Sequence, residues 1–318
     1  MIVRVGAGHQ HNHGRATATA TGRHSGRLTV VLAIVLAVLA VEVIGAWLSS
    51  SLALLADAGH MLTDAAGITL ALIAARLARR PPSPRRTFGW QRVEILAAAL
   101  NGLLLLGVAA YVLVAAVGRL REPTEVEGPL VIFVAALGLI ANTIGLLLLR
   151  RGQRESLNIR GAYLEVLGDL LGSVAALAAG LVVTLTGFDR ADPIASLMIV
   201  ALIVPRAAGL LREAGHVLLE GTPPGVDLDH VRAHILAVPG VSDVHDLHVW
   251  TITSGRHVVS AHVVVGAARL REDCAGDLGA TGGVLDELTT CLAHHFDVAH
   301  STFQLEPATH RDHEPRLH

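Results

Sequence analysis

Two pairs of acidic or imidazole side chains stand four residues apart inside apolar stretches of this 318-residue chain. The first pair is His60 and Asp64, in LADAGHMLTD, and the second is Glu165 and Asp169, in LEVLGDLLGS. Residues four apart project from the same face of a helix, so each pair can offer two neighbouring ligands. One imidazole nitrogen and three carboxylate oxygens suit tetrahedral zinc, and they also admit cadmium, cobalt or manganese. We therefore predict a site for a divalent metal ion between the two segments.

Two more acidic residues lie in apolar stretches. Asp57 stands three residues before His60 and near the same helix face, while Glu42 is the lone acid of the first apolar stretch. A charge at the bilayer centre costs about 2.5–3.5 kcal/mol on insertion scales, so each needs a reason. We predict that Asp57 assists the metal site, and that Glu42 lines the access path or accepts a proton. The alternative is that the polar groups of the second and fifth stretches only satisfy one another between packed helices, and that Glu42 only forms a hydrogen bond to a neighbouring helix.

Six apolar stretches surround these groups, each near the roughly 20 residues that a membrane-spanning helix needs. They cover residues 28–49, 52–78, 90–118, 129–149, 162–187 and 193–211. Only 16% of the residues are charged, against about a quarter in soluble domains. We therefore predict an α-helical membrane protein whose six transmembrane helices form a domain over residues 28–212. The net charge of −2 argues against nucleic acid as a partner.

Arginines are unevenly distributed between the two sides of these stretches. They gather before the first stretch and in the connections after the second and the fourth, within residues 15–27, 76–92 and 150–160. Arginine-rich connections face the cytoplasm, which predicts that both chain termini are cytoplasmic. The polar first 26 residues and the long run behind them do not resemble a cleavable signal. We expect a multi-pass protein of the inner (plasma) membrane.

The last third of the chain is predicted to form a cytoplasmic α+β domain over residues 213–307. Helical spacing over 228–238 and 278–295 and alternation over 244–253, 257–265 and 302–305 give the order helix, hairpin, helix, strand. That order fits a ferredoxin-like sandwich. The ends, residues 1–27 and 308–318, are predicted to be disordered tails with histidines. These tails either collect metal loosely or only keep the chain soluble.

Four segments closely resemble the cation diffusion facilitator family of zinc, cadmium and cobalt exporters. They are ADAGHMLTDAAG, RRPPSPRRTFGWQRVEILAAALNG, GDLLGS and HDLHVW, and the resemblance runs from about Glu42 to Glu306. It implies a homodimer of six-helix subunits that exchanges cytoplasmic metal for external protons, without enzymatic activity or an organic cofactor. The family's transport site maps onto the two pairs already described.

The resemblance also implies roles outside the transport site. A regulatory zinc site near the dimer interface maps onto four residues of the cytoplasmic domain: His245, His262, His300 and Glu306. Arg92 or Glu94, in FGWQRVE, would make a charge interlock between helices that couples domain motion to transport. The alternative for that segment is anchoring of Trp90 and Arg92 at the membrane interface.

Glu165 departs from the pattern of zinc-transporting members, which usually carry histidine at this position. A hard oxygen ligand and an extra negative charge replace a nitrogen ligand, which broadens the expected range of metals. An intramembrane metalloprotease would need HExxH, and HMLTD lacks its glutamate. A membrane-bound sensor that binds metal without moving it is the alternative function, and metal flux separates it from an exporter.

Overall fold

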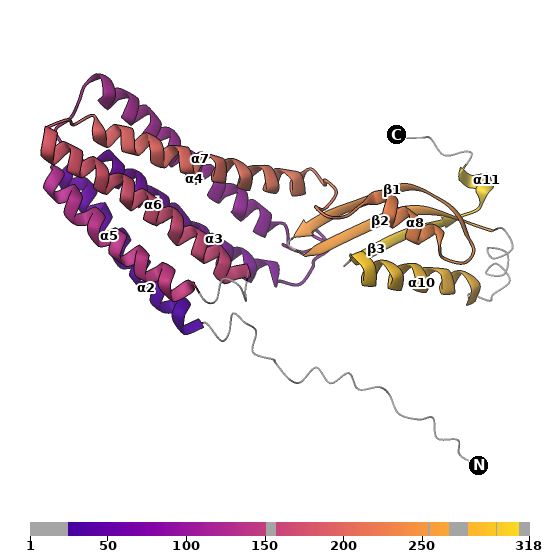
Figure 1. Cartoon of the computed structure of the whole chain (residues 1–318). Coiled ribbons are helices and arrows are strands. Elements are labelled where there is room, and N and C mark those ends of the chain that lie inside the picture. Colours follow the sequence, from indigo (N-terminus) through magenta and orange to yellow (C-terminus); the bar gives the residue numbers. More distant parts are fainter. Residues whose placement is uncertain (1–24, 151–156, 254, 267–278, 297, 312–318) are drawn as a thin grey trace, which may run out of the picture. The chain divides into compact units, whose positions relative to one another are not determined.

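Long apolar helices dominate the first part of the chain in this computed structural model. It describes residues 25–150, 157–253, 255–266, 279–296 and 298–311 (Figure 1). The helices are α2 (Ser25–Ser49), α3 (Leu52–Ala78), α4 (Val93–Arg121), α5 (Gly128–Leu149), α6 (Leu157–Thr186) and α7 (Ala191–Leu218). Among the described residues, α3 to α7 are each long and apolar enough to cross a membrane, while the apolar part of α2, Ala33–Ser49, is shorter. The predicted class, a helical membrane protein with a C-terminal α+β domain, is confirmed.

The helix boundaries differ most from the predicted stretches at α6, which begins at Leu157 and not at residue 162, and at α7, which continues to Leu218 and not to residue 211. Smaller differences occur at α4. The stretch predicted to begin at residue 90 becomes helical at Val93. Gly89 adopts a left-handed φ of 69°, and the Val93 amide donates to the Trp90 carbonyl at 3.0 Å, so the chain still turns there. The chain divides into two compact units, Met1–Ala65 with Leu104–Arg206, and Ala66–Leu103 with Ala207–His318.

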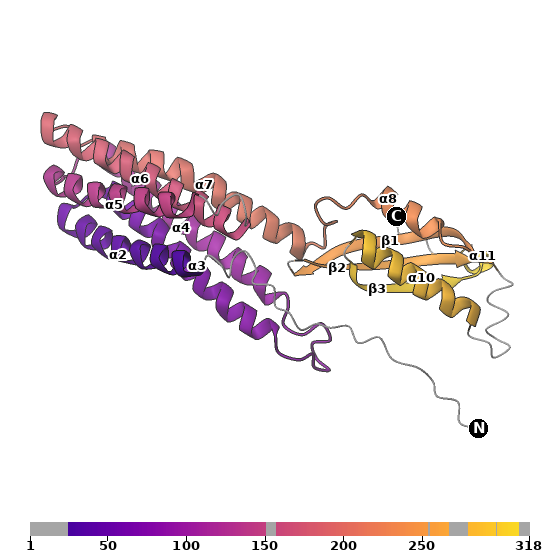
Figure 2. The same ribbon diagram turned by 60° about the horizontal axis from the view of Figure 1, so that its bottom comes forward.

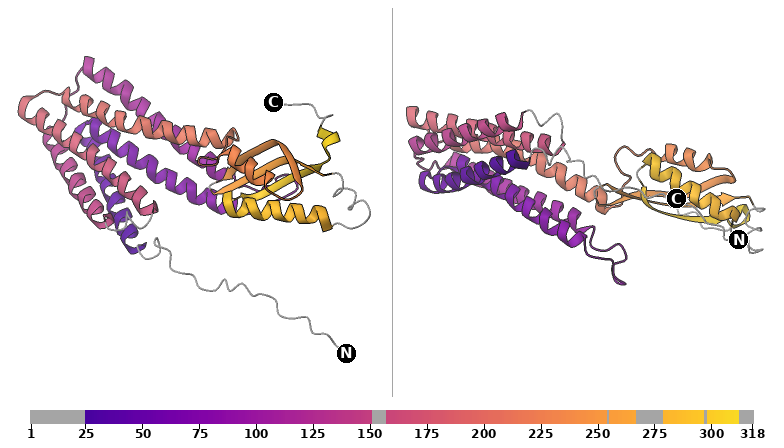
Figure 3. Two further views of the ribbon diagram at one scale, coloured as in Figure 1. Left: turned by 45° about the vertical axis from the view of Figure 1, so that its right-hand side comes forward. Right: turned by 90° about the horizontal axis from the view of Figure 1, so that it is seen from below.

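In the first unit, α5 packs against both α2 and α6 (Figures 1 and 3). Small residues make such contacts close, since helices in lipid associate by packing and polar contacts. A Cβ atom added to Gly45 of α2 would lie 2.6 Å from Val134 Cγ2 of α5. These helices therefore provide a tightly packed support for the polar groups that α3 and α6 carry.

Asp192, at the start of α7, holds the first turn of α3. Its carboxylate accepts hydrogen bonds from the Ser51 hydroxyl at 2.5 Å and from the backbone amides of Leu52 at 2.7 Å and Ala53 at 3.2 Å. The first amides of a helix have no partner within the helix, so a carboxylate at this place satisfies them. Asp192 is 1% exposed, and Arg119 Nη1 lies 3.7 Å from its Oδ2 atom.

The second unit contains a sheet of order β1-β2-β3, with β1 (Val241–Thr253) antiparallel to β2 (Arg256–Val265) and β3 (Val298–Glu306) parallel to β2. Helices α8 (Leu228–Leu236) and α10 (Gly279–Phe296) cover one face of the sheet (Figure 2). Their residues Ile235 and Leu288 share a core with Val259 and Val263 of β2.

The two tails predicted at the chain ends fall largely outside the described residues. Residues 1–24 and 312–318 are not described, and residues 308–311 form the short helix α11 (Ala308–Arg311). The His310 amide donates to the Pro307 carbonyl at 2.9 Å in that turn.

Replacing Asp192 with alanine should destabilise the protein, because the first amides of α3 and the Ser51 hydroxyl lose their acceptor. We expect a cost of about 1–3 kcal/mol and a lower unfolding temperature for the detergent-solubilised protein. Asp192→Asn keeps one acceptor oxygen, so its unfolding temperature should lie between those of the wild type and Asp192→Ala. Glu125→Ala, an exposed acid before α5, is the control. Wild-type stability of Asp192→Ala would show that this contact does not hold α3 in place.

Candidate functional site

His60 lies between two carboxylates from two different helices. Its Nδ1 atom is 3.6 Å from Asp64 Oδ2, one turn further along α3, and its Nε2 atom is 3.7 Å from Asp169 Oδ1 on α6. His60 is 7% exposed and Asp169 4% exposed. Among the described residues the buried His60 Nδ1 atom has no hydrogen-bond partner, although buried polar atoms normally have one. An imidazole nitrogen and carboxylate oxygens this close together are a set of ligands that a divalent metal ion can use. The structure thus brings these three predicted ligands together.

Glu165, the fourth predicted ligand, joins the group through an arginine that the sequence analysis missed. Arg206 of α7 donates from Nη2 to Glu165 Oε1 at 2.6 Å and from Nη1 to Asp64 Oδ2 at 3.3 Å. The same Nη1 lies 3.4 Å from His60 Nε2. The available signal was a lone arginine inside the sixth apolar stretch, because charged residues in membrane spans are rare and usually paired.

Glu42 of α2 and Asp57 of α3 are two further buried acids of the helices. Glu42 is 0% exposed and Asp57 1% exposed. Both Glu42 oxygens and Asp57 Oδ2 lack a hydrogen-bond partner among the described residues. A Cβ atom on Gly172 of α6 would lie 2.5 Å from Asp57 Oδ1, and one on Gly138 of α5 would lie 2.8 Å from Glu42 Oε1. Glycine at these two places therefore allows the backbones to approach the acids.

A second group of ligand atoms lies on the sheet of the cytoplasmic domain. His245 Nε2 is 2.8 Å from Glu306 Oε1, and His262 Nδ1 is 3.7 Å from Glu306 Oε2. The three residues offer ligand atoms that all lie within 4.8 Å of one another, which fits a divalent metal ion. Glu306 is 2% exposed, and the Gln304 amide donates to its Oε2 atom at 3.2 Å.

The strand register explains why these residues meet. His245 pairs with His262 across β1 and β2, and the pair Val244 and Val263, one step away, faces the core under α8 and α10. Since side chains alternate along a strand, the two histidines lie on the opposite face. One extra residue in β1 after His245 forms a bulge, where Asp246 has a φ of 45°. Bulges of this kind redirect neighbouring side chains beside functional sites.

His300 does not join this group within one chain. In the parallel register of β2 and β3, His300 pairs with Val258. His300 stands six residues before Glu306 in β3, and six residues of a strand span about 20 Å. Its ring instead contacts Phe88, with ring centroids 5.8 Å apart. The grouping of His300 with Glu306 followed from the family resemblance, and the strand was predicted to cover only residues 302–305. The observed β3 runs over nine residues, with His300 near its start and Glu306 at its end, and so separates the two side chains.

Arg92 and Glu94, the predicted interlock residues, each have a polar partner in the second unit. Arg92 Nη2 lies 2.6 Å from Glu220 Oε1, just beyond the end of α7. Glu94 accepts a hydrogen bond from the Thr253 hydroxyl at the end of β1. Sequence reasoning missed Glu220, because no regular spacing relates the two residues. Arg92 is partly exposed and Glu220 is exposed.

Two family descriptions match the chain. The cation efflux transmembrane domain matches residues 28–219, and the cytoplasmic domain of cation efflux proteins matches residues 223–308. Together they span both the helices that carry His60 and the sheet that carries Glu306.

Three curated relatives are similar over nearly the whole chain. The metal cation efflux system protein CzcD of Cupriavidus metallidurans is 43% identical over 304 residues, 96% of this chain and 91% of that protein. The zinc transporter ZitB of Escherichia coli is 38% identical over 94% of this chain and 92% of that protein. The cadmium, cobalt and zinc/H(+)-K(+) antiporter of Bacillus subtilis is 34% identical over 95% of this chain and 93% of that protein. The chain therefore belongs to the cation efflux family, the cation diffusion facilitators, which are membrane transporters and not enzymes.

Proposed function

We propose that the protein exports divalent metal ions from the cytoplasm in exchange for protons, with zinc as the main cargo and cadmium and cobalt as further ones. The observation that carries the proposal is the convergence of His60, Asp64 and Asp169 from two membrane helices, with Glu165 joined to them through Arg206. The names of the relatives, a zinc transporter and a cadmium, cobalt and zinc antiporter among them, support this choice of cargo.

The transport site is proposed to consist of His60, Asp64, Glu165 and Asp169. Histidine and carboxylate ligands must lose their protons before they bind a metal ion, so metal and protons compete for the same atoms. Metal entering from the cytoplasm releases protons from these side chains, and protons from the other side displace the metal. The buried carboxylates of Glu42 and Asp57 lie close to the same helices and are proposed as auxiliary acceptors.

The cytoplasmic group His245, His262 and Glu306 is proposed to hold a regulatory zinc ion. When bound, zinc would crosslink β1, β2 and β3 through one ligand from each strand, and this would stiffen the sheet. A fourth ligand is needed for closed tetrahedral coordination. The second subunit of the proposed homodimer would supply that ligand, and its own His300 is our candidate.

The protein is proposed to sit in the bacterial inner membrane with both termini in the cytoplasm. The uneven distribution of arginines supports this orientation. The Arg92–Glu220 ion pair, at 2.6 Å, is proposed as the interlock between the start of α4 and the end of α7.

Asp64→Ala should reduce zinc flux into proteoliposomes by roughly 100-fold or more, because it removes a carboxylate from the site and leaves His60 with one fewer partner. Flux is measured with a trapped zinc-sensitive dye under an imposed proton gradient. Thr143→Ala, on the exposed face of α5, serves as the matched control and should transport at the wild-type rate.

Two results would contradict the proposal. Full flux in Asp64→Ala would remove this residue from the transport site. Zinc binding to the wild-type protein without any flux, for zinc, cadmium and cobalt alike, would favour the membrane-bound sensor.

A further inference from the structure

Arg206 places a permanent positive charge among the proposed metal ligands. Its guanidinium lies 2.6 Å from Glu165 Oε1, 3.3 Å from Asp64 Oδ2 and 3.4 Å from His60 Nε2. The Glu165 contact is a short, charge-assisted bond of the stronger kind. Three of the four ligands are therefore engaged by one side chain of the same chain, and arginine stays charged at any physiological pH.

The charge of this group matches a divalent ion only when Arg206 is counted. With neutral His60, three ionised carboxylates give three negative charges, and the guanidinium leaves two. Glu165 supplies the third negative charge, at the position where histidine was expected, and Arg206 makes its shortest contact with this residue. The guanidinium thus compensates for the unusual ligand.

We propose that Arg206 is a tethered cation of the transport site, which offsets the charge of Glu165 and competes with the metal ion for the carboxylates. This inference rests on the proposed function of the site. In the empty site the guanidinium occupies the carboxylate oxygens. When a metal ion binds, it must displace the guanidinium from Asp64 and Glu165, and the guanidinium returns as the metal leaves.

The position of Arg206 in α7 suits such a movement. Pro205, directly before it, lies inside the helix. Proline donates no backbone hydrogen bond and disturbs the preceding turn, so α7 is less constrained at this point than a regular helix. The guanidinium can therefore shift away from the carboxylates with a local change in α7.

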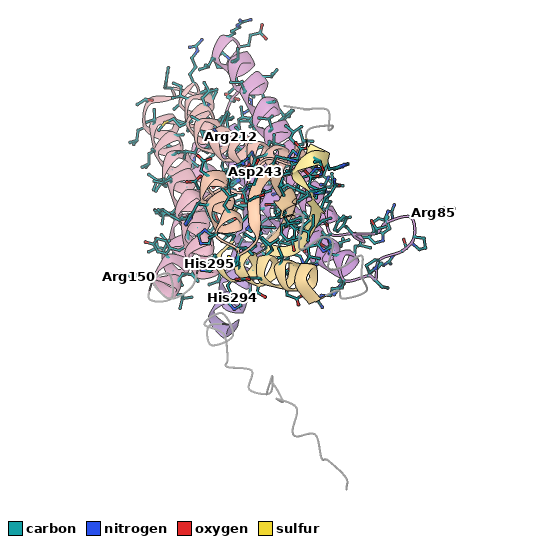
Figure 4. All side chains as sticks on the ribbon, turned by 90° about the vertical axis from the view of Figure 1, so that its right-hand side faces the viewer. Arg85, Arg150, Arg212, Asp243, His294 and His295 are labelled. Atoms are coloured by element: carbon teal, nitrogen blue, oxygen red, sulfur yellow. The ribbon has the colours of Figure 1, made fainter. Side chains whose placement is uncertain are left out.

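Arg206→Met keeps a long side chain and removes the charge. We expect zinc to bind more tightly and to leave more slowly, because no guanidinium competes with it for the carboxylates. Both KM and kcat for zinc transport in proteoliposomes should therefore fall by about tenfold, which corresponds to about 1.4 kcal/mol. Arg206→Lys keeps the charge but not the two-pronged geometry of the guanidinium. Its KM and kcat should therefore lie nearer to the wild-type values than those of Arg206→Met. Arg212→Met, at an exposed arginine of the same helix (Figure 4), is the matched control.

A double variant separates charge balance from a packing role. Arg206→Met combined with Glu165→Gln restores two net negative charges, and we expect it to recover much of the lost kcat. An unchanged or higher KM in Arg206→Met, or no recovery in the double variant, would overturn the role of Arg206. Absence of zinc flux in the wild-type protein would instead overturn the proposed function.

A different set of side chains lies between α8 and α10 in the cytoplasmic domain. His230 and His234 of α8 stand four residues apart, as do Cys291 and His295 of α10. Ring centroids are 4.5 Å apart for His230 and His234 and 4.8 Å apart for His234 and His295, while Cys291 Sγ lies 3.8 Å from His295 Nδ1. Two pairs of soft or borderline ligands thus face each other across the contact of these helices.

Two imidazoles of this group hydrogen-bond through Nδ1 to a backbone carbonyl one turn earlier in their helix. His234 Nδ1 lies 3.0 Å from the His230 carbonyl, and His295 Nδ1 lies 2.9 Å from the Cys291 carbonyl. A backbone carbonyl on Nδ1 fixes the proton there and leaves Nε2 with its lone pair, as in metal-binding histidines. The group also lies on the helix-covered side of the sheet, opposite to His245 and His262.

We infer that Cys291, His295, His234 and His230 form a second metal site of the cytoplasmic domain, after side-chain rotations that bring their donor atoms together. One thiolate and up to three imidazoles suit zinc, cobalt or cadmium. His230 and His295 are exposed and Cys291 is partly exposed, so an ion reaches the group from solvent. Binding would fasten α8 to α10.

Cobalt titration of the full-length, detergent-solubilised protein tests this site, because cobalt bound to a thiolate gives a near-ultraviolet charge-transfer band. Cysteine occurs twice in the chain, so Cys274→Ser leaves Cys291 as the single thiol. We expect the band in Cys274→Ser, its loss in Cys274→Ser with Cys291→Ser, and about tenfold weaker cobalt binding when His234→Ala is added to Cys274→Ser. His294→Ala, at the neighbouring exposed histidine of α10 (Figure 4), should leave the band unchanged. No band in Cys274→Ser, or an unchanged affinity in His234→Ala, would overturn the site.

Discussion

The structure depends on the need to keep several ionisable side chains paired within apolar surroundings. Asp64, Glu165 and Asp169 are held by His60 and Arg206, at distances between 2.6 and 3.7 Å. An unpaired charge in apolar surroundings would cost several kcal/mol, so the pairing with His60 and Arg206 makes the ionised forms of Asp64, Glu165 and Asp169 less costly. The same need keeps the site responsive, because a metal ion, a proton or a guanidinium can each provide the balancing positive charge.

The supporting helices serve this arrangement. Gly172 and Gly138 let backbones approach Asp57 and Glu42, which no larger residue would allow without movement. Asp192 accepts hydrogen bonds from the first amides of α3, about three turns before Asp64. This contact helps to fix the position of His60 and Asp64 along the axis of α3. Rigid support around this group suits the proposed exchange of metal and protons, because a binding site needs its side chains held in place by their surroundings.

The helices, the two pairs of acidic or imidazole residues and two of the strands were predictable from the sequence, because regular spacing carries information about helices and strands. The apolar stretches and the four-residue spacing gave the helices and the pairs, and alternation gave β1 and β2. Arg206 and Glu220 were not predicted as parts of these groups. Their partners, Glu165 and Arg92, lie 41 and 128 residues away in the sequence, and only tertiary packing brings them together. The grouping of His300 with Glu306 needed the length and register of β3, and the pairing of α8 with α10 needed the packing of the domain core.

The coupling of metal to protons tests the central claim most directly. Proteoliposomes loaded with a pH-sensitive dye, without an imposed gradient, are supplied with external zinc, and zinc uptake and internal pH are recorded together. If metal and protons exchange at one site, zinc entry should raise the internal pH in proportion to the zinc moved. Zinc entry with no change in internal pH, in the presence of an ionophore that prevents a membrane potential, would contradict exchange at this site.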